Sequence, residues 1–287
     1  MVNQNCEIEK RKTSSFSKRL ACLSLILVCY SFLQAQDLYK PTADDLHALE
    51  NVIVEKYYVA TENDCKDTIG GKLAKGSITY RIYLDLKPGY KVETVFGSDI
   101  HPLFIETTTS FFNDTILGAG TGDNIIRYNV NKHNVALDSW VTLESATNFH
   151  NAVLKSEDND SSFITCKEQL KKADGLKFGN ISGIVFFGTD LNFFKNYVNA
   201  KRFVLNDGAW ANFAWVDGPT PTNRVLVAQL TTDGILSFEL NAQIATPTGE
   251  TIRFVAKHNI ADDTIDNVHP FSEILCKELS FNSKQIK

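Results

Sequence analysis

The sequence predicts an all-β fold, an antiparallel two-sheet sandwich of jelly-roll or immunoglobulin-like kind. Residues 78–86 (ITYRIYLDL) alternate apolar and polar side chains, the period-two pattern of a strand with one buried face. The turn-forming pairs Pro88-Gly89 and Asp233-Gly234 separate runs rich in β-branched and aromatic residues. Such short runs recur along the chain without amphipathic helices between them, which favours stacked sheets over an α/β architecture.

The expected strands begin at residue 51. The first one is expected at residues 51–60 (NVIVEKYYVA). A rival prediction places a short helix before it, which starts at Thr42, has Asp45 in the capping-box position and covers residues 43–49. The later strands are expected at residues 78–86, 91–96, 103–112, 135–143, 183–187, 201–205, 225–231, 236–244 and 251–256. Residues 78–96 and 225–244 are each expected to form a hairpin, because a turn joins two alternating runs.

The two hairpins are expected to share one core. The alternation predicts that Tyr80, Ile82 and Leu84 face inward, toward Leu236 and its neighbours Phe238 and Leu240, while Tyr83 faces solvent.

Four segments are less regular. Residues 61–71 (TENDCKDTIGG) are expected to be an acidic loop, residues 162–173 a weak helix, and residues 206–219 an aromatic loop. In the tail after Pro270, four apolar residues at helical spacing predict a short docking helix; they are Phe271, Ile274, Leu275 and Leu279.

The N-terminus has the pattern of a signal peptide. Five basic residues precede the apolar run 20–33 (LACLSLILVCYSFL), and Ala35 offers a small residue for cleavage. We therefore expect three parts: a signal peptide at residues 1–35, a β-sandwich at 36–257, and a C-terminal tail at 258–287. The mature chain is expected to be secreted, to the periplasm, the cell surface or the extracellular space. No other apolar run is long enough to span a bilayer.

The charge and the cysteines narrow the function classes. Removing residues 1–35 leaves 24 basic and 32 acidic residues, a net charge of −8, which disfavours a nucleic-acid partner. Cys65, Cys166 and Cys276 remain, an odd number that allows three alternative single bridges and leaves one thiol over. Their spacing matches no zinc motif.

Aromatic residues supply the main candidate for ligand binding. Trp210, Phe213 and Trp215 lie close together between turn-forming residues, and aromatic rings flanked by amides and carboxylates suit stacking against a sugar. The alternative is that these rings cap the core.

Calcium is the one candidate cofactor. Asp158, Asn159 and Asp160 place several oxygen ligands in one loop, although the spacing is not that of an EF-hand and solvated turns have the same composition. No catalytic residues are assigned, because nucleophile-elbow and zinc-hydrolase motifs are absent. Five acids on the expected strands, Asp85, Glu93, Glu106, Asp138 and Glu239, remain as candidates for a hydrolytic carboxylate pair.

Several segments resemble a recurring β-rich region of large secreted bacterial proteins of uncharacterised function, often found beside adhesion or sorting modules. They are residues 51–60, 76–97 (GSITYRIYLDLKPGYKVETVFG), 107–113 (TTTSFFN), 137–141 (LDSWV), 207–212 (DGAWAN) and 223–244 (NRVLVAQLTTDGILSFELNAQI). The resemblance covers most of residues 51–257 and implies export and β-structure, but no catalytic residues. The chain departs from the pattern in its charged residues 167–172 and in showing no sorting domain after residue 257.

The sequence thus predicts an exported, non-catalytic binding or structural module at the cell surface or in the extracellular space. A carbohydrate-binding unit or carbohydrate-active enzyme is the alternative, with a glycan or another component of the cell envelope as the expected partner.

Overall fold

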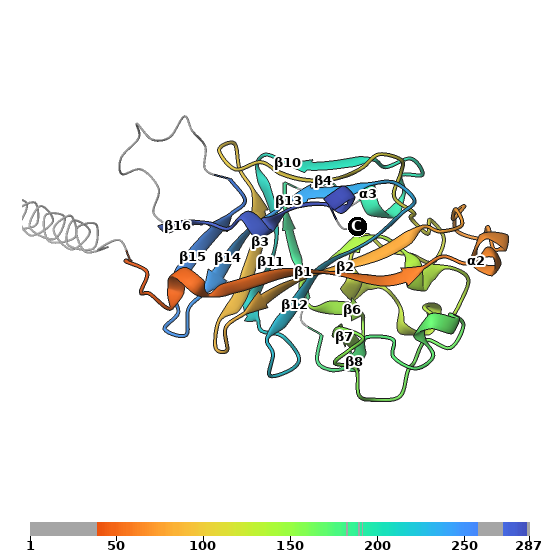
Figure 1. The fold of residues 1–287 in the computed structure, drawn as a ribbon, viewed down its shortest axis with the longest axis horizontal. Helices are drawn as coiled ribbons and strands as arrows, with labels where there is room; N and C mark the ends of the chain where they lie inside the picture. The colour runs from red at the N-terminus through yellow and green to blue at the C-terminus, as the bar shows by residue number, and fades with distance from the viewer. Residues whose placement is uncertain (1–38, 182, 189, 191, 258–271, 286–287) are drawn as a thin grey trace, which may run out of the picture. The chain divides into compact units, whose positions relative to one another are not determined.

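A computed structural model describes residues 39–181, 183–188, 190, 192–257 and 272–285. The expected signal peptide, residues 1–35, and the first part of the C-terminal tail, residues 258–271, lie outside this set. The described chain from Pro41 onward belongs to one unit, drawn in Figure 1. None of its helices is both long and apolar enough to cross a membrane.

The all-β prediction is confirmed, with the strands arranged in several packed sheets. The β2 sheet has the order β1 (Leu49–Val59), β2 (Ile78–Leu86), β12 (Arg224–Thr232), β5 (Trp140–Val141). The β3 sheet has the order β16 (Ser272–Leu275), β15 (Thr251–Val255), β14 (Asn241–Ala245), β3 (Lys91–Gly97), β11 (Gly208–Val216), β9 (Val185–Phe187). The β4 sheet has the order β10 (Arg202–Leu205), β4 (Leu103–Thr107), β13 (Leu236–Glu239), β17 (Ser280–Asn282). The β7 sheet contains β6 (Ser145–Thr147), β7 (His150–Ala152) and β8 (Leu176–Phe178).

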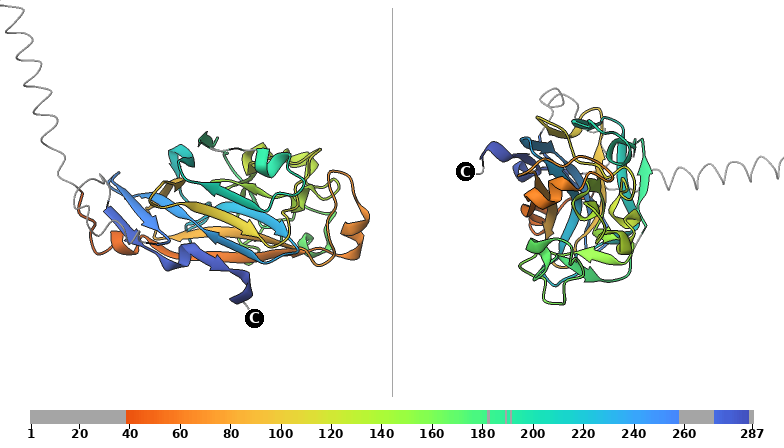
Figure 2. Two further views of the ribbon diagram at one scale, coloured as in Figure 1. Left: turned by 90° about the horizontal axis from the view of Figure 1, so that it is seen from above. Right: turned by 90° about the vertical axis from the view of Figure 1, so that its right-hand side faces the viewer.

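Helices contribute little to the described chain. The α-helices are α2 (Glu62–Lys66) and α3 (Asn192–Lys195). Single 3-10 turns occur at Asp45–His47, Gly122–Asn124, Arg127–Asn129, Val135–Leu137, Glu168–Leu170, Lys277–Leu279 and Ser283–Gln285. In Figures 1 and 2 the green, loop-rich part of the chain, which includes the β7 sheet, lies at the opposite end of the unit from β14, β15 and β16.

Both expected hairpins are wrong. β2 pairs with β1 and β12, whereas β3 pairs with β11 and β14, so the Pro88-Gly89 turn carries the chain from one sheet to another. The Asp233-Gly234 turn likewise joins β12 to β13 of the β4 sheet. Alternation reports which faces of a strand are buried and says nothing about which strand lies beside it, so the pattern could not distinguish a hairpin from a crossing between sheets.

The β2 strand is buried on both faces, contrary to the one-sided pattern expected. Ile82 and Tyr83 are both inaccessible to solvent. Tyr83 packs in a core cluster with Tyr57, Trp140 and Leu226, and its hydroxyl donates a hydrogen bond to the carbonyl oxygen of Val153 at 2.9 Å. The loop-rich part of the chain covers the face that was expected to meet water, and a hydroxyl with a carbonyl partner makes that burial tolerable.

Several local expectations change with the tertiary context. The aromatic segment 206–219 contains strand β11 instead of being a loop, and residues 135–143 form a 3-10 turn followed by the two-residue strand β5. The segment 61–71 contains α2, which Thr61 and Asp64 begin with a reciprocal capping box. Only Glu168–Leu170 of the weak helix expected at 162–173 is helical, as a 3-10 turn.

A helical segment was predicted near each end of the unit, before β1 and after Pro270. A helical turn precedes β1, but it covers only Asp45–His47 of the rival helix expected at residues 43–49. The side chain of Asp45 accepts hydrogen bonds from Thr42. The docking helix expected after Pro270 is not formed by the described residues of that tail. Ile274 and Leu275 belong to β16, which pairs in parallel with β15, and Leu279 belongs to the 3-10 turn Lys277–Leu279.

A buried ion pair ties α2 to the loop-rich part of the chain. Lys167 Nζ lies 2.7 Å from an Asp64 carboxylate oxygen, and both side chains are about 5% exposed. Tyr58 and Asn134 complete the group with hydrogen bonds to Asp64 and from Lys167, respectively. Because every charged atom has a partner, this network can persist away from water.

Candidate functional site

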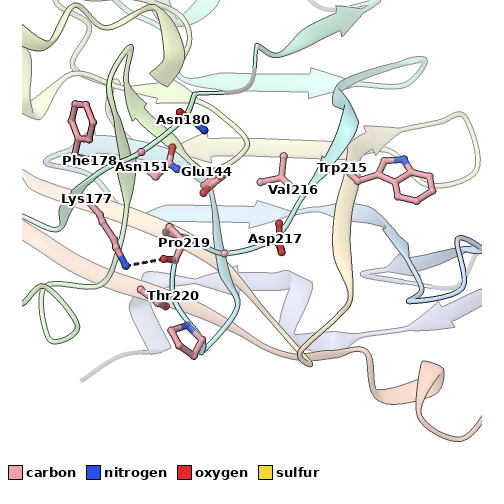
Figure 3. Close-up of a pocket in the computed structure, with 13 residues that line it drawn as sticks. Glu144, Asn151, Lys177, Phe178, Asn180, Trp215, Val216, Asp217, Pro219 and Thr220 are labelled. Atoms are coloured by element: carbon pink, nitrogen blue, oxygen red, sulfur yellow. Dashed lines mark hydrogen bonds between the residues drawn. The ribbon is translucent and has the colours of Figure 1, made fainter.

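An open hollow of about 550 Å³ lies where the β7 sheet meets the end of strand β11 and the loop that follows it. We call it the β7 hollow. Figure 3 shows the residues that line it: Glu144, Asn151, Lys177, Phe178, Gly179, Asn180 and the segment 215–221.

The backbone of Glu144 is held in an unusual conformation. Its φ is +75°, in the left-handed region that non-glycine residues seldom occupy. Its amide donates to the carbonyl oxygen of Leu226 at 2.7 Å, and its carbonyl accepts from the amide of Ala152 at 2.9 Å. These contacts fix the residue between β12 and β7. Strain of this kind persists only where the surrounding structure imposes it, and it is frequent at functional sites.

The carboxyl group of Glu144 is mostly withdrawn from water. Burial, reinforced by the negative charge of Asp217, raises the pKa of Glu144 to about 8. No described residue hydrogen-bonds this carboxyl group. At pH 7 it is therefore predominantly neutral and offers the hollow both a donor and an acceptor.

Asn151 contributes a second polar group to the β7 hollow. It lies on β7 and is 6% exposed, and its Oδ1 has no hydrogen-bond partner among the described residues. Figure 3 shows Glu144, Asn151 and Asn180 close to one another in the hollow. A buried acceptor without a partner is costly, so a donor from a ligand or water stabilises this arrangement.

Two charged residues line the walls of the β7 hollow. Lys177 Nζ donates to the carbonyl oxygen of Pro219 at 2.9 Å, which links β8 to the loop after β11. Asp217 lies 3.6 Å from Lys91 Nζ, an exposed ion pair. With Glu144 neutral, Lys177 and Asp217 are the charged side chains that line the hollow.

Exposed aromatic rings extend from one side of the hollow. Phe178 is 68% exposed and stacks on Phe149, with ring centroids 6.5 Å apart and planes at 22°. Tyr128 is also exposed and lies beside Arg127, whose guanidinium also lies over Phe149. We call Tyr128, Phe149 and Phe178 the aromatic rim.

The three aromatic residues predicted from the sequence are separated by the structure. Trp210 is fully buried and donates its indole N–H to the carbonyl oxygen of Thr142 at 2.9 Å, so it belongs to the core and we exclude it from the candidate site. Phe213 is 78% exposed and packs edge-on against Phe187, outside the hollow. Trp215 does line the hollow, although Figure 3 shows its indole pointing away from Glu144.

A bulge in β11 explains why Phe213 and Trp215 are exposed. Residues 212–215 of β11 lie opposite the single residue Glu93 of β3, because Ala211 pairs with Thr94 and the next pair is Val216 with Val92. The extra residues break the inward and outward alternation, and Trp215 takes a φ of +53°.

In the loop 158–160, predicted as a calcium site, the carboxylate of Asp158 is already hydrogen-bonded to the backbone. One carboxylate oxygen of Asp158 accepts the backbone amides of Asp174 and Gly175, and the other accepts the amide of Asp160. In the part of the chain that the structure describes, Asp158, Asn159 and Asp160 belong to no group of three or more metal-ligating side chains.

The sequence interpretation missed Glu144, Asn151 and Phe178. Phe149 and Phe178 lie in a segment that is otherwise mostly polar. An isolated aromatic residue in such a segment was the one sequence feature that could have indicated an exposed ring at a binding site. The left-handed backbone of Glu144 and the missing partner of Asn151 depend on contacts with β12 and β8, which no local pattern encodes.

Comparison with known proteins gives no match to a family model, to a curated protein or to a solved structure. The functional argument therefore depends on the geometry of the hollow.

Proposed function

We propose that this chain is an exported glycan-binding protein whose β7 hollow holds a sugar unit. The proposal rests on three side chains at one hollow: the carboxyl group of Glu144 and the Oδ1 of Asn151, which have no hydrogen-bond partner among the described residues, and the exposed ring of Phe178 at the edge. Export is supported by the signal-peptide pattern of residues 1–35 and by the resemblance to secreted bacterial proteins.

A sugar matches the chemistry of these side chains. Each hydroxyl both donates and accepts, so a ring with several hydroxyls can satisfy the neutral carboxyl of Glu144 and the Oδ1 of Asn151 together. The C–H face of the same ring is apolar and packs on an aromatic side chain such as Phe178. A purely apolar ligand would leave the polar groups without partners, which costs affinity.

Calcium is not part of this proposal. The carboxylate of Asp158 already accepts three backbone amides, which leaves less capacity for a cation with six to eight oxygen ligands.

Hydrolysis is the second candidate, because Glu144 and Asp217 are two carboxyl groups in one hollow and the first has a raised pKa. Three of the acids considered from the sequence are instead paired with basic side chains: Asp85 with Arg224, Glu106 with Arg202, and Glu239 with Lys257. Release of reducing ends from a bound glycan, abolished by Glu144→Gln, would support hydrolysis over binding alone.

Two matched phenylalanines test glycan binding. Phe178 and Phe213 are both exposed and each packs against one other phenylalanine, but only Phe178 borders the hollow. After a glycan array identifies a ligand, we expect Phe178→Ala to weaken binding by at least about 5-fold in calorimetry, from lost stacking. Phe213→Ala should bind as the wild type does, and both variants should melt within a few degrees of it. Absence of any glycan ligand, or equal affinity of the two variants, would contradict the proposal.

A further inference from the structure

The guanidinium of Arg127 is surrounded by aromatic rings next to the β7 hollow. Its central carbon lies 4.8 Å from the ring centroid of Tyr128, 5.4 Å from that of Phe149 and 5.0 Å from that of Phe163. Stacking of this kind uses the faces of the guanidinium, so the N–H groups at its edge stay available to hydrogen-bond acceptors.

This positive charge has no carboxylate partner among the described residues, and the Nε of Arg127 is a buried donor without an acceptor. Arg202 provides the contrast. It also lies over an aromatic ring, 5.2 Å from the centroid of Phe104, but it forms an ion pair with Glu106 at 3.2 Å. An arginine held in place by rings and left without an anion is arranged to receive one.

The rings around Arg127 connect it to the proposed sugar site. Phe149 contacts both Arg127 and Phe178, and Phe178 borders the hollow in which Lys177 lies. His150 also packs against Phe178; burial and then the charge of Arg127 lower its pKa, so at pH 7 it adds no positive charge. Lys177 shares its surroundings with the carboxylates of Asp217 and Asp160, so the positive charge without a carboxylate partner at this surface is that of Arg127.

We propose that Arg127 forms a second subsite, which binds the carboxylate or sulfate of an acidic sugar next to the unit held in the β7 hollow. The inference rests on the proposed glycan binding and narrows its ligand class to acidic oligosaccharides at least two units long. The planar guanidinium pairs with either anion through two parallel hydrogen bonds, while the aromatic rim packs against the sugar ring that bears it.

The test compares acidic oligosaccharides with their own neutral forms. An array carries uronate oligosaccharides beside their carboxyl-reduced forms, and sulfated oligosaccharides beside their desulfated forms. Wild-type protein should bind at least one acidic form roughly 10- to 100-fold more tightly than its neutral counterpart, the range expected for a hydrogen bond to a charged group. That preference should diminish as sodium chloride is raised.

Matched variants assign the preference to Arg127. Arg127→Gln should remove it while retaining the weaker binding of the neutral form, and Arg202→Gln should leave both affinities unchanged. Thermal melts show whether either variant is folded, and Arg127→Lys, which retains the charge, should keep part of the preference.

The outcomes separate the two proposals. Neutral glycans that bind in a Phe178-dependent way with no preference for the acidic form would overturn the role of Arg127 and leave glycan binding standing. An acidic preference that persists in Arg127→Gln would also overturn it. If no glycan of either kind binds, both proposals fail.

Discussion

Replacing Glu144 with glutamine should stabilise the protein at neutral and alkaline pH. The folded-state pKa of Glu144 is raised from 4.5 to about 8, so between these two values the folded state binds more protons than the unfolded state. The free energy of unfolding of the wild type therefore falls as the pH rises through this window. Glutamine has nearly the same shape and does not ionise, so the variant lacks this loss.

The size of the effect follows from the same pKa. At 1.36 kcal/mol per pH unit, a change from 4.5 to about 8 corresponds to at most about 5 kcal/mol. Glu144 keeps some contact with water, which screens the charge, so we expect Glu144→Gln to exceed the wild type by about 2 to 4 kcal/mol at pH 8 and above. At pH 4 both forms are neutral at this position and should be equally stable.

Urea denaturation of both proteins at pH 4, 6, 7 and 8.5 measures this difference. Asp217→Asn serves as the control: it removes the second cause of the raised pKa, so the loss of stability should end at a lower pH in that variant. A difference between Glu144→Gln and wild type that does not change with pH, or a variant that is less stable at pH 8.5, would refute the reasoning.

Two further substitutions test the packing. Trp210→Ala removes a fully buried ring and its hydrogen bond to Thr142, so we expect a loss of about 3 to 5 kcal/mol in denaturant unfolding, and a loss below about 1 kcal/mol would place the ring outside the core. Lys167→Met leaves the buried carboxylate of Asp64 without its cation and should cost about 3 to 5 kcal/mol at pH 7; the double variant with Asp64→Asn should recover part of that loss, and no recovery would contradict the pairing.

The sequence predicted the fold class because alternation is a local property. The strands predicted at residues 78–86 and 225–231 agree with β2 and β12 to within one residue at each end. Their partners were not, since a strand in stacked sheets has the same pattern whether it pairs with its neighbour in sequence or with a distant segment. Tyr83 shows the same limit: the alternation predicts that it faces solvent, and this is wrong because residues distant in sequence, such as Trp140 and Leu226, pack with it in the core.

The candidate site was predictable only in its general chemistry. Aromatic rings beside amides and carboxylates were expected at residues 206–219, and the structure places such a combination near the end of that segment but builds it with Phe178, Asn151 and Glu144. Trp215 lines the hollow, whereas Trp210 lies on the side of β11 that faces the core and is buried. The bulge that decides between these two tryptophans is a matter of register with β3, which a single strand does not reveal.

The order of strands in the sheets has a consequence for how the chain folds. β2 obtains its second neighbour only from β12, and the β3 and β4 sheets are completed by β16 and β17, which lie from residue 272 onward. A shorter N-terminal fragment would expose the unpaired edge of β2, a site for association with other chains. Contacts between such distant segments also slow folding, because each must first close a long loop. The native sheets can therefore form only when nearly the whole described chain is present, and until then the polypeptide stays accessible to any machinery that handles unfolded chains.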